Sequence, residues 1–375
     1  MISAWIGWVA CVGIAAAPVA DATRIDALIK QLGDPSFRVR DAATRELLEI
    51  GPPAKRALRK AELDPDPEVR ARCAFILPRI LVLDLKLRID KFLADPDSVD
   101  VQDLPGLHKY REMVGDKQPA RELYAEMVKH HGEWMEKIAT DPRQAAQRYR
   151  EFVAEYYNRH RVNGVAQTAN LILPTDSADL AVFFFLGSDP VTRGGELPYI
   201  QVSNILRYRM FLDAVNSREA DSLPIRPLFV KWAEQQTHVT IQTRILTLAN
   251  TSEIKELLPF AVKLIKEPVG IVRVKAYAAM VVGKFGTKEH LPILERMFDN
   301  EGVLTTVRFG DMSGTVQLRD VMLAMSIQLV GDKLEGYGFD LLNTNPISVV
   351  SYYQLGFSSE EKREAAFRKW REQTK

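Results

Sequence analysis

The stretch Asp34–Ala43, with the sequence DPSFRVRDAA, returns 30 positions later as Asp64–Cys73, DPDPEVRARC. A turn that ends in Asp-Pro, followed by a helix that opens with Val-Arg and carries a small residue four positions after the valine, is typical of half a helical hairpin. Such a hairpin cannot bury its apolar face alone, so copies have to stack on one another. The repeat therefore predicts an all-α chain, an α-solenoid of helical hairpins.

The composition is that of an ordinary folded protein. Of 375 residues, 46% are hydrophobic and 26% are charged, which is enough for a large core. Fifty Lys and Arg residues stand against 49 Asp and Glu residues, a formal net charge of +1. Binding to a phosphate backbone usually requires a marked positive excess, so nucleic acid is an unlikely partner.

The first 22 residues resemble a secretory leader. An apolar run from Trp5 to Ala17 precedes Pro18, and Ala20-Asp21-Ala22 offers a small-x-small cleavage site. We expect export to the periplasm or cell envelope, with cleavage after Ala22 or Ala20. The alternatives are an uncleaved membrane anchor, a cytosolic start, or a lipoprotein box at residues 8–11 that lacks the usual leucine.

Helix and turn patterns divide the chain into five segments. We expect the leader in residues 1–22, N-terminal hairpins in 23–82, an irregular helical middle region in 83–236, a second array in 237–335 and a C-terminal capping segment in 336–375.

Within these segments, some elements are predicted individually. The second hairpin is expected to end near Leu81, and one helix is expected over Tyr199–Asn216. The nearly all-apolar stretch Leu180–Leu186 predicts a deeply buried helix. Residues 303–316 are β-prone on both sides of a turn and predict a small hairpin inserted between helices. The C-terminal helix carries Phe367 and Trp370 on one face, as a terminal cap should.

The repeated block, together with the Gly51-Pro52-Pro53 restart, resembles the HEAT repeat. Two further stretches, Leu258–Leu264 and Leu291–Phe298, stand 33 positions apart and flank Val272-Arg273 and Ala276. The layout as a whole is similar to that of exported bacterial HEAT-repeat proteins. Three features carry this resemblance: the leader joined directly to a repeat pair, residues 104–116 and residues 356–370. This resemblance implies an armadillo-type fold and carries over no catalytic residue.

The resemblance also implies a role for the recurring positions of the block. They are Asp34, Arg40, Ala43, Asp64, Arg70, Cys73, Arg273 and Ala276. An alternative is that the arginines line a groove for carboxylates, but a partly buried guanidinium needs its donors satisfied. In HEAT repeats such an arginine pairs with the loop aspartate of a neighbouring unit, so we expect a structural ladder. Cys73 is expected to be a buried thiol, because it fills the small-residue position of Ala43.

Candidate chemical sites are weak. His130 and His131, with Glu133 and Glu136, form the best metal cluster. Adjacent residues on a helix point about 100° apart, so they could chelate together only if the helix ended at Gly132, and a solvated helix end is the favoured interpretation. Gly194-Gly195 precedes an acidic residue, which opposes phosphate binding and favours a surface loop. No catalytic residue, metal ligand or cofactor is assigned.

Aromatic residues gather in the middle region, where a hydrophobic pocket and core packing are the two interpretations. They are Tyr149, Phe152, Tyr156, Tyr157 and Phe183 to Phe185. Unbroken apolar stripes on helices normally face the core, so packing is favoured.

These observations favour a non-catalytic scaffold that binds a protein or peptide partner on its inner face. The alternative is an enzyme with its site in the irregular middle region, and a nucleic-acid scaffold is disfavoured. A membrane is expected as a partner only through an uncleaved leader.

Overall fold

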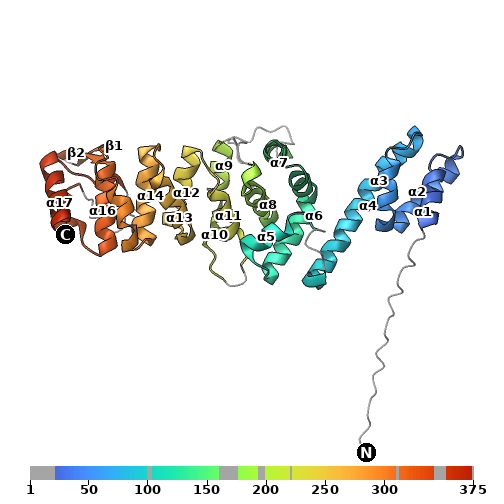
Figure 1. Ribbon diagram of the computed structural model, residues 1–375, viewed down its shortest axis with the longest axis horizontal. Helices are drawn as coiled ribbons and strands as arrows, with labels where there is room; N and C mark the ends of the chain where they lie inside the picture. Colours follow the sequence, from blue (N-terminus) through green and yellow to red (C-terminus); the bar gives the residue numbers. More distant parts are fainter. Residues whose placement is uncertain are drawn as a thin grey trace, which may run out of the picture. The chain divides into compact units, whose positions relative to one another are not determined.

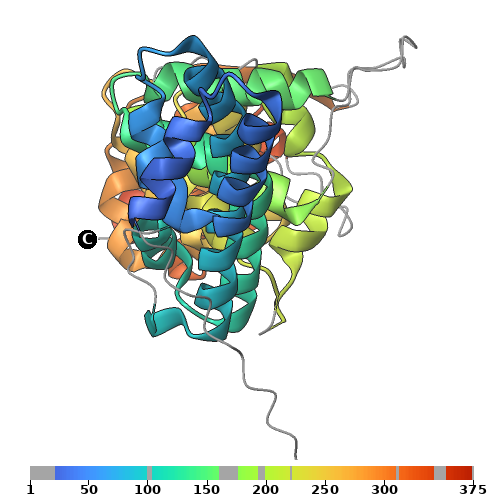
Figure 2. The same cartoon turned by 90° about the vertical axis from the view of Figure 1, so that its right-hand side faces the viewer.

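The computed structural model describes residues 22–98, 104–159, 176–192, 199–219, 222–309, 312–341 and 352–373. Within them the chain forms seventeen α-helices and one two-stranded antiparallel sheet (Figure 1 and Figure 2). The predicted all-α class is confirmed, and the expected hairpin is present as β1 (Val303–Phe309) and β2 (Met312–Gln317). In this described part, no helix is long and apolar enough to cross a membrane. The expected leader falls outside it, except for Ala22.

The chain divides into two compact units, Met1–Leu104 and Pro105–Lys375. The helices of the first are α1 (Ala22–Gln31), α2 (Phe37–Ile50), α3 (Lys55–Ala61) and α4 (Pro67–Ala94), with 3-10 turns at Pro52–Ala54 and Pro96–Ser98. Helix α1 packs on α2, and α3 packs on α4. Both copies of the sequence block place their small residue, Ala43 or Cys73, in the same hydrophobic core.

Helix α4 is longer than expected. The sequence pattern predicts an end near Leu81, whereas the helix continues to Ala94. Residues 82–94 contain neither glycine nor proline, so nothing in the backbone stops the helix before Asp95-Pro96. Ile89 and Phe92 are buried, which shows that this extension also packs.

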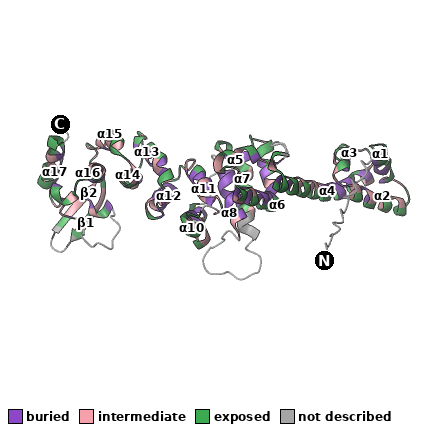
Figure 3. Cartoon of the chain, turned by 90° about the horizontal axis from the view of Figure 1, so that it is seen from below, coloured by how far each residue is buried: buried purple, intermediate pink, exposed green. Residues whose placement is uncertain are grey.

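The first half of the second unit surrounds one buried helix. Its helices are α5 (Leu107–Val114), α6 (Gln118–Thr140), α7 (Ala145–Arg159), α8 (Ser177–Gly187), α9 (Tyr199–Ile205), α10 (Arg209–Asn216) and α11 (Ile225–Ala233), with a 3-10 turn at Pro190–Thr192. The residues of α8 from Ala178 to Gly187 are all buried, as predicted (Figure 3). Helix α8 packs on α6, α7 and α11. Gly187 has to lack a side chain, because an added Cβ would collide with Tyr149 and Trp232.

The single helix expected over Tyr199–Asn216 is in fact two. Helix α9 ends at Ile205, and α10 begins after Tyr208, whose backbone is extended with φ −70° and ψ 137°. The Leu206 carbonyl between them accepts a hydrogen bond of 3.2 Å from the guanidinium of Arg244. Arg244 belongs to α12 (Val239–Thr251), so this break depends on a tertiary contact that local sequence does not show.

In the second half of the unit, helices that are close in the sequence pack on one another. They are α12, α13 (Leu258–Lys266), α14 (Val272–Phe285), α15 (Leu291–Glu295), α16 (Leu318–Val330) and α17 (Glu360–Gln373), with 3-10 turns at Lys255–Leu257, Lys288–His290, Leu334–Tyr337 and Tyr352–Gln354. Helix α14 packs against α12, α13 and α16. The approach of α14 to α16 is close, since a Cβ at Gly283 would collide with Met325.

A buried ion pair fixes the C-terminal helix. Arg363 on α17 and Asp320 on α16 are 2% and 0% exposed. The Nε of Arg363 donates to Oδ1 of Asp320 at 2.8 Å, and Nη2 donates to Oδ2 at 3.3 Å. Asp320 also accepts from the Gln317 N–H at 2.8 Å, which closes the capping box of α16. Burial raises the pKa of Asp320 to about 6, against the lowering effect of Arg363.

Breaking this pair should destabilise the second unit. The substitution Asp320→Asn keeps the side-chain volume but removes the charge that Arg363 faces, and breaking a buried pair costs about 3 kcal/mol. Urea denaturation followed by circular dichroism would measure the loss. The double variant Asp320→Leu/Arg363→Met removes both charges and should lose less than the single variant. A single variant as stable as the wild type would show that the pair does not hold α17.

Candidate functional site

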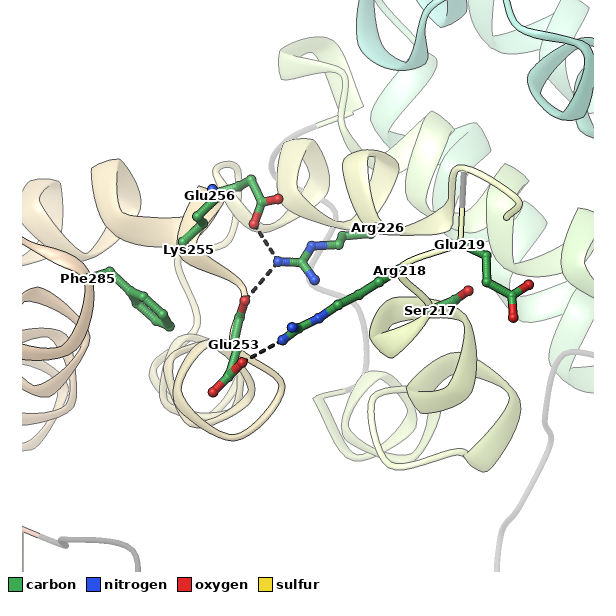
Figure 4. A pocket seen from close by; sticks show the side chains of 8 residues that line it. All are labelled: Ser217, Arg218, Glu219, Arg226, Glu253, Lys255, Glu256 and Phe285. Atoms are coloured by element: carbon green, nitrogen blue, oxygen red, sulfur yellow. Dashed lines mark hydrogen bonds and ion pairs between the residues drawn. The ribbon is translucent and has the colours of Figure 1, made fainter. Parts of the chain in front are cut away.

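A charged pocket in the second unit is the candidate functional site (Figure 4). It has a volume of about 560 Å³ and is lined by Ser217, Arg218, Glu219, Arg226, Glu253, Lys255, Glu256 and Phe285. These residues come from the segment between α10 and α11, the first turn of α11, the turn between α12 and α13, and the end of α14. Three helical pairs therefore contribute to one site, which we call the charged pocket.

Glu253 has an unusual backbone conformation. Its φ is 51°, and among the residues described here it is the one non-glycine residue with positive φ. Helix α12 ends just before it, and the Ile254 N–H donates to the Ala249 carbonyl at 3.0 Å. This is the Schellman type of helix end, in which glycine usually takes the left-handed position. A glutamate there is held in an unfavourable conformation, and such conformations are a sign of a functional constraint.

The carboxylate of Glu253 lies among cations. Arg218 donates a hydrogen bond to it, and the ammonium of Lys284 lies 3.7 Å from its other oxygen. The hydrogen bond from Arg218, followed by the charge of Lys284, holds the pKa of Glu253 below its ordinary value. The side chains of Arg218 and Glu253 are 72% and 53% exposed, so this pair faces solvent.

Arg226 orders the turn that carries Glu253. Its Nη2 donates to the Glu253 carbonyl at 2.8 Å and to the carboxylate of Glu256 at 2.7 Å. The Arg226 side chain is only 18% exposed. Arg226 therefore has a structural role in the pocket, whereas Arg218 and Glu253 present their charges to solvent (Figure 4).

This arrangement suits reversible binding of charged groups. Exposed ion pairs contribute little net stability, so the charges of a ligand can replace one partner at small cost. Cations and carboxylates alternate around the pocket, so a ligand with a single sign of charge would meet repulsion as well as attraction. A ligand that carries both signs fits the pocket best.

The structure gives Arg40 different partners from those expected. Its Nη1 donates to the carbonyls of Asp34 and Pro35, at 2.7 and 3.0 Å. The carboxylate of Asp34 instead accepts from the N–H of Ser36 at 2.7 Å. The expected aspartate–arginine ladder is therefore wrong, because the carbonyls of the turn need donors and Arg40 supplies them. The link to the next helical pair is made by Glu68, which lies 2.9 Å from Arg40 Nε.

Arg70 repeats this geometry. Its Nη1 donates to the carbonyls of Asp64 and Pro65, at 2.7 and 2.8 Å. Asp64 accepts from the N–H of Asp66 at 2.9 Å. The two copies of the sequence block thus form the same turn, closed by the same cation.

In the second unit this role belongs to Lys275, whereas Arg273 was expected to take it. Arg273 is exposed, while Lys275 is 5% exposed and donates to the carbonyls of Ile265, at 2.9 Å, and Glu267. Lys275 is the fourth residue after the N-cap Ile271, as Arg40 is after the N-cap of α2. The Val-Arg pair at 272–273 has the same residue types as the repeated block. It lies two positions closer to the N-cap of its helix than Val39-Arg40 does.

The small-residue position moves by the same two residues. Ala278 stands seven residues after the N-cap of α14, as Ala43 does after the N-cap of α2. Ala276, which was expected there, is also fully buried. Both alanines face the core, so the pattern of burial alone did not reveal the shift.

His130 and His131 do not stand at a helix end. Helix α6 continues through Gly132, so the expected solvated end is wrong. Nε2 of His131 lies 2.7 Å from Oδ1 of Asp179 on α8, and these side chains are 5% and 8% exposed. His130 lies on a different face and is 3.5 Å from Asp176. The described residues contain no group of three His, Cys, Asp or Glu side chains that could hold a metal.

The aromatic residues of the middle region pack in the core, as favoured. Tyr149, Phe152 and residues 183–185 are buried. Trp232, which sequence analysis missed, lies at the centre of the same cluster, 5.7 Å from Phe183 and 5.4 Å from Phe184 between ring centroids. The side chains of residues 156 and 157 lie outside the described part of the chain.

Two smaller expectations concern Cys73 and the glycine-rich loop. Cys73 is fully buried, and burial raises its pKa to about 11, so its thiol is a poor nucleophile. Residues 194–196 lie outside the described residues.

None of the residues of the charged pocket was predicted from the sequence. One available signal was Thr251-Ser252-Glu253, a helix end without glycine or asparagine. No protein-family model matches this chain, and no curated protein is similar to it. The resemblance to HEAT repeats therefore remains a prediction from the sequence.

Removing the charge of Glu253 should make stability less dependent on pH. The pKa of Glu253 is lowered in the folded state, so its contribution is present above the unfolded pKa of about 4.3 and is lost as the pH falls through the lower folded pKa. We expect Glu253→Gln to be less stable than the wild type at pH 7, with a smaller difference at pH 3, below the unfolded pKa of about 4.3. Urea denaturation at both pH values measures this, and an equal difference at both would contradict the assigned ion pairs.

Proposed function

We propose that this chain is a non-catalytic α-solenoid of the HEAT-repeat type, and that its charged pocket binds a segment of a protein or peptide partner. The observation that carries this proposal is the mixed charge of the pocket, in which Arg218 and Glu253 form an exposed pair. A polypeptide segment with neighbouring acidic and basic side chains can exchange with that pair.

The helical packing supports the solenoid. In both units a cation four residues after a helix N-cap donates to carbonyls of the preceding segment, as Arg40, Arg70 and Lys275 do. Helices α12 to α16 pack on near neighbours in the sequence, which is the arrangement that repeated hairpins require. Stacked repeats place their turns in rows, so one site can draw side chains from several units.

The pocket is suited to binding rather than to bond breaking. Its arginines remain charged at any physiological pH, and Glu253 remains ionised because its pKa is lowered. General acid–base catalysis needs a group that gains and loses a proton near the working pH. Fixed charges of both signs instead orient a charged partner.

We also propose that the chain acts in the cell envelope. The support is the apolar stretch and the small-x-small site in residues 1–22. An uncleaved leader, which would anchor the chain in a membrane, is the alternative. N-terminal sequencing of the native protein distinguishes the two.

An enzyme with its site in the middle region is the second candidate function. The observation in its favour is the His131–Asp179 pair, which resembles the orienting half of a catalytic triad. Nδ1 of His131 is buried and has no hydrogen-bond partner among the described residues. Both side chains are more than 90% shielded from solvent, so a substrate has little access to them. The pair is more simply explained as a packing contact between α6 and α8.

Site-specific crosslinking tests the proposed binding site. With p-benzoylphenylalanine in place of Lys255 in the native host, ultraviolet light should produce discrete adducts with another polypeptide. The same residue in place of Lys129, on an exposed face of α6, is the control and should give none.

A charge-swapped variant separates binding from folding. Arg218→Glu/Glu253→Arg keeps an ion pair in the pocket but exchanges its two ends. A cation at position 253 faces Lys284, so we expect a stability no higher than that of Glu253→Gln. We expect the adduct yield to fall about tenfold relative to Glu253→Gln, since each reversed contact opposes the partner. Undiminished adducts in this variant, or equal adducts at the Lys129 position, would refute the proposed site.

A further inference from the structure

The turn between α13 and α14 exposes aliphatic side chains to solvent. Pro268, Val269 and Ile271 form its tip, and Val269 and Ile271 are 90% and 52% exposed. Among the large hydrophobic residues that the structure describes, Val269 is the most exposed. We call residues 268–271 the α13–α14 tip. Aliphatic side chains in such positions cost solvation energy unless they meet an apolar environment.

Positive charge surrounds the tip. Lys263 and Lys266 lie in the last turn of α13, and Arg273 lies in the first turn of α14, all three exposed. Beside the tip there is a shallow hollow of about 480 Å³, lined by Pro259, Val262, Lys263, Lys266, Glu267 and Pro268. Glu267 is the one acidic residue of this hollow, so the local charge is positive.

The sheet extends this surface. A Cβ at Gly302 would lie 3.0 Å from Val272, which places the start of β1 beside the start of α14. The next residue, Val303, is 58% exposed, and Arg308 on the same strand is also exposed. Val303 therefore extends the aliphatic surface from the tip to the start of β1, beside the exposed Glu301.

Hydrogen bonds from Lys275 fix the backbone on both sides of the tip. Lys275 donates to the carbonyls of Ile265 and Glu267, which tie the end of α13 to the second turn of α14. A fixed turn presents its apolar side chains without an additional ordering cost when it meets a surface.

We propose that the α13–α14 tip docks onto the surface of an anionic lipid bilayer. Val269 and Ile271 enter the interface between headgroups and acyl chains, while Lys263, Lys266 and Arg273 lie among the lipid phosphates. Small aliphatic groups surrounded by cations suit this environment, because apolar burial and attraction to anionic lipid act together. A protein-binding surface would more often carry aromatic anchors, and none is exposed at the tip.

A comparable turn in the first unit has the opposite charge. Leu63, between α3 and α4, is 88% exposed, almost as much as Val269. Arg59 and Lys60 end α3 and Arg70 follows in α4, much as cations flank the tip. Four acidic residues, Glu62, Asp64, Asp66 and Glu68, outnumber these three cations. An anionic surface would repel this turn. Exposure alone therefore does not define the proposed contact; the excess of cations over carboxylates at the tip does.

Docking at the tip leaves the charged pocket open. The pocket lies at the start of α13, around Glu253 and Glu256, and the tip follows its end at Lys266. A helix of nine residues is about 14 Å long, so the two sites stand at opposite ends of it. The proposal is independent of the pocket: each can fail without the other.

A fluorescent label on the tip tests the proposal in the full chain. In a Cys11→Ser background, Val269→Cys is labelled with nitrobenzoxadiazole, while the buried thiol of Cys73 does not react. We expect the emission to increase about twofold or more with phosphatidylglycerol vesicles and to stay unchanged with phosphatidylcholine vesicles. Because the signal is local, a leader that itself binds lipid does not produce it.

Two matched variants complete the experiment. The label at Leu63→Cys should remain in water with both lipids. Lys263→Gln/Lys266→Gln should weaken binding to phosphatidylglycerol vesicles, measured by titration with the Val269→Cys label, by about fivefold for each lysine removed. A label at residue 269 that stays in water, responds equally to both lipids, or is shielded only by added protein or by a second copy of the chain would overturn the proposal.

Discussion

The structure depends on a cationic side chain that closes the turn of a helical pair. Arg40 and Arg70 donate to carbonyls of the turn just before their own helix, and Lys275 donates to carbonyls at the end of the preceding helix, α13. The carbonyl of Ile265, in the last turn of α13, has no partner within its own helix and would be costly to bury unpaired. With the turn closed, the two helices are fixed against each other, and small residues such as Ala43 and Ala278 allow close packing. The expected aspartates serve only to shape the turn.

Because the turn is closed through backbone carbonyls, the side chains at its tip are free to vary. The turn at Leu63 contains three acidic residues, Glu62, Asp64 and Asp66, whereas the turn at Val269 contains one, Glu267. The opposite ends of the helices vary in the same way, and there Glu253 and its arginine partners form the charged pocket. The same type of helical pair can therefore carry a proposed lipid contact at one end of α13 and a proposed polypeptide site at the other.

The sequence predicted the helical class, the buried helix α8 and the inserted hairpin, because these follow from apolar periodicity and turn chemistry. It did not predict the extension of α4 or the break between α9 and α10, because the break depends on Arg244 from a distant helix. The shift from Arg273 to Lys275 was missed because either cation can close a turn. Only the N-cap, Ile271, shows which of the two stands four residues into the helix. The charged pocket was missed because its residues are ordinary surface charges until three helical pairs bring them together.

The stability of a Lys275→Met variant tests the central claim most directly. Methionine retains much of the apolar stem of lysine but cannot donate to the carbonyls of Ile265 and Glu267. We expect a loss of about 2 to 3 kcal/mol in urea denaturation, since a buried carbonyl is left unsatisfied. Arg273→Met, at the exposed neighbour, should change stability by less than about 0.5 kcal/mol. Equal stability of Lys275→Met and the wild type would contradict the claim that this cation closes the turn.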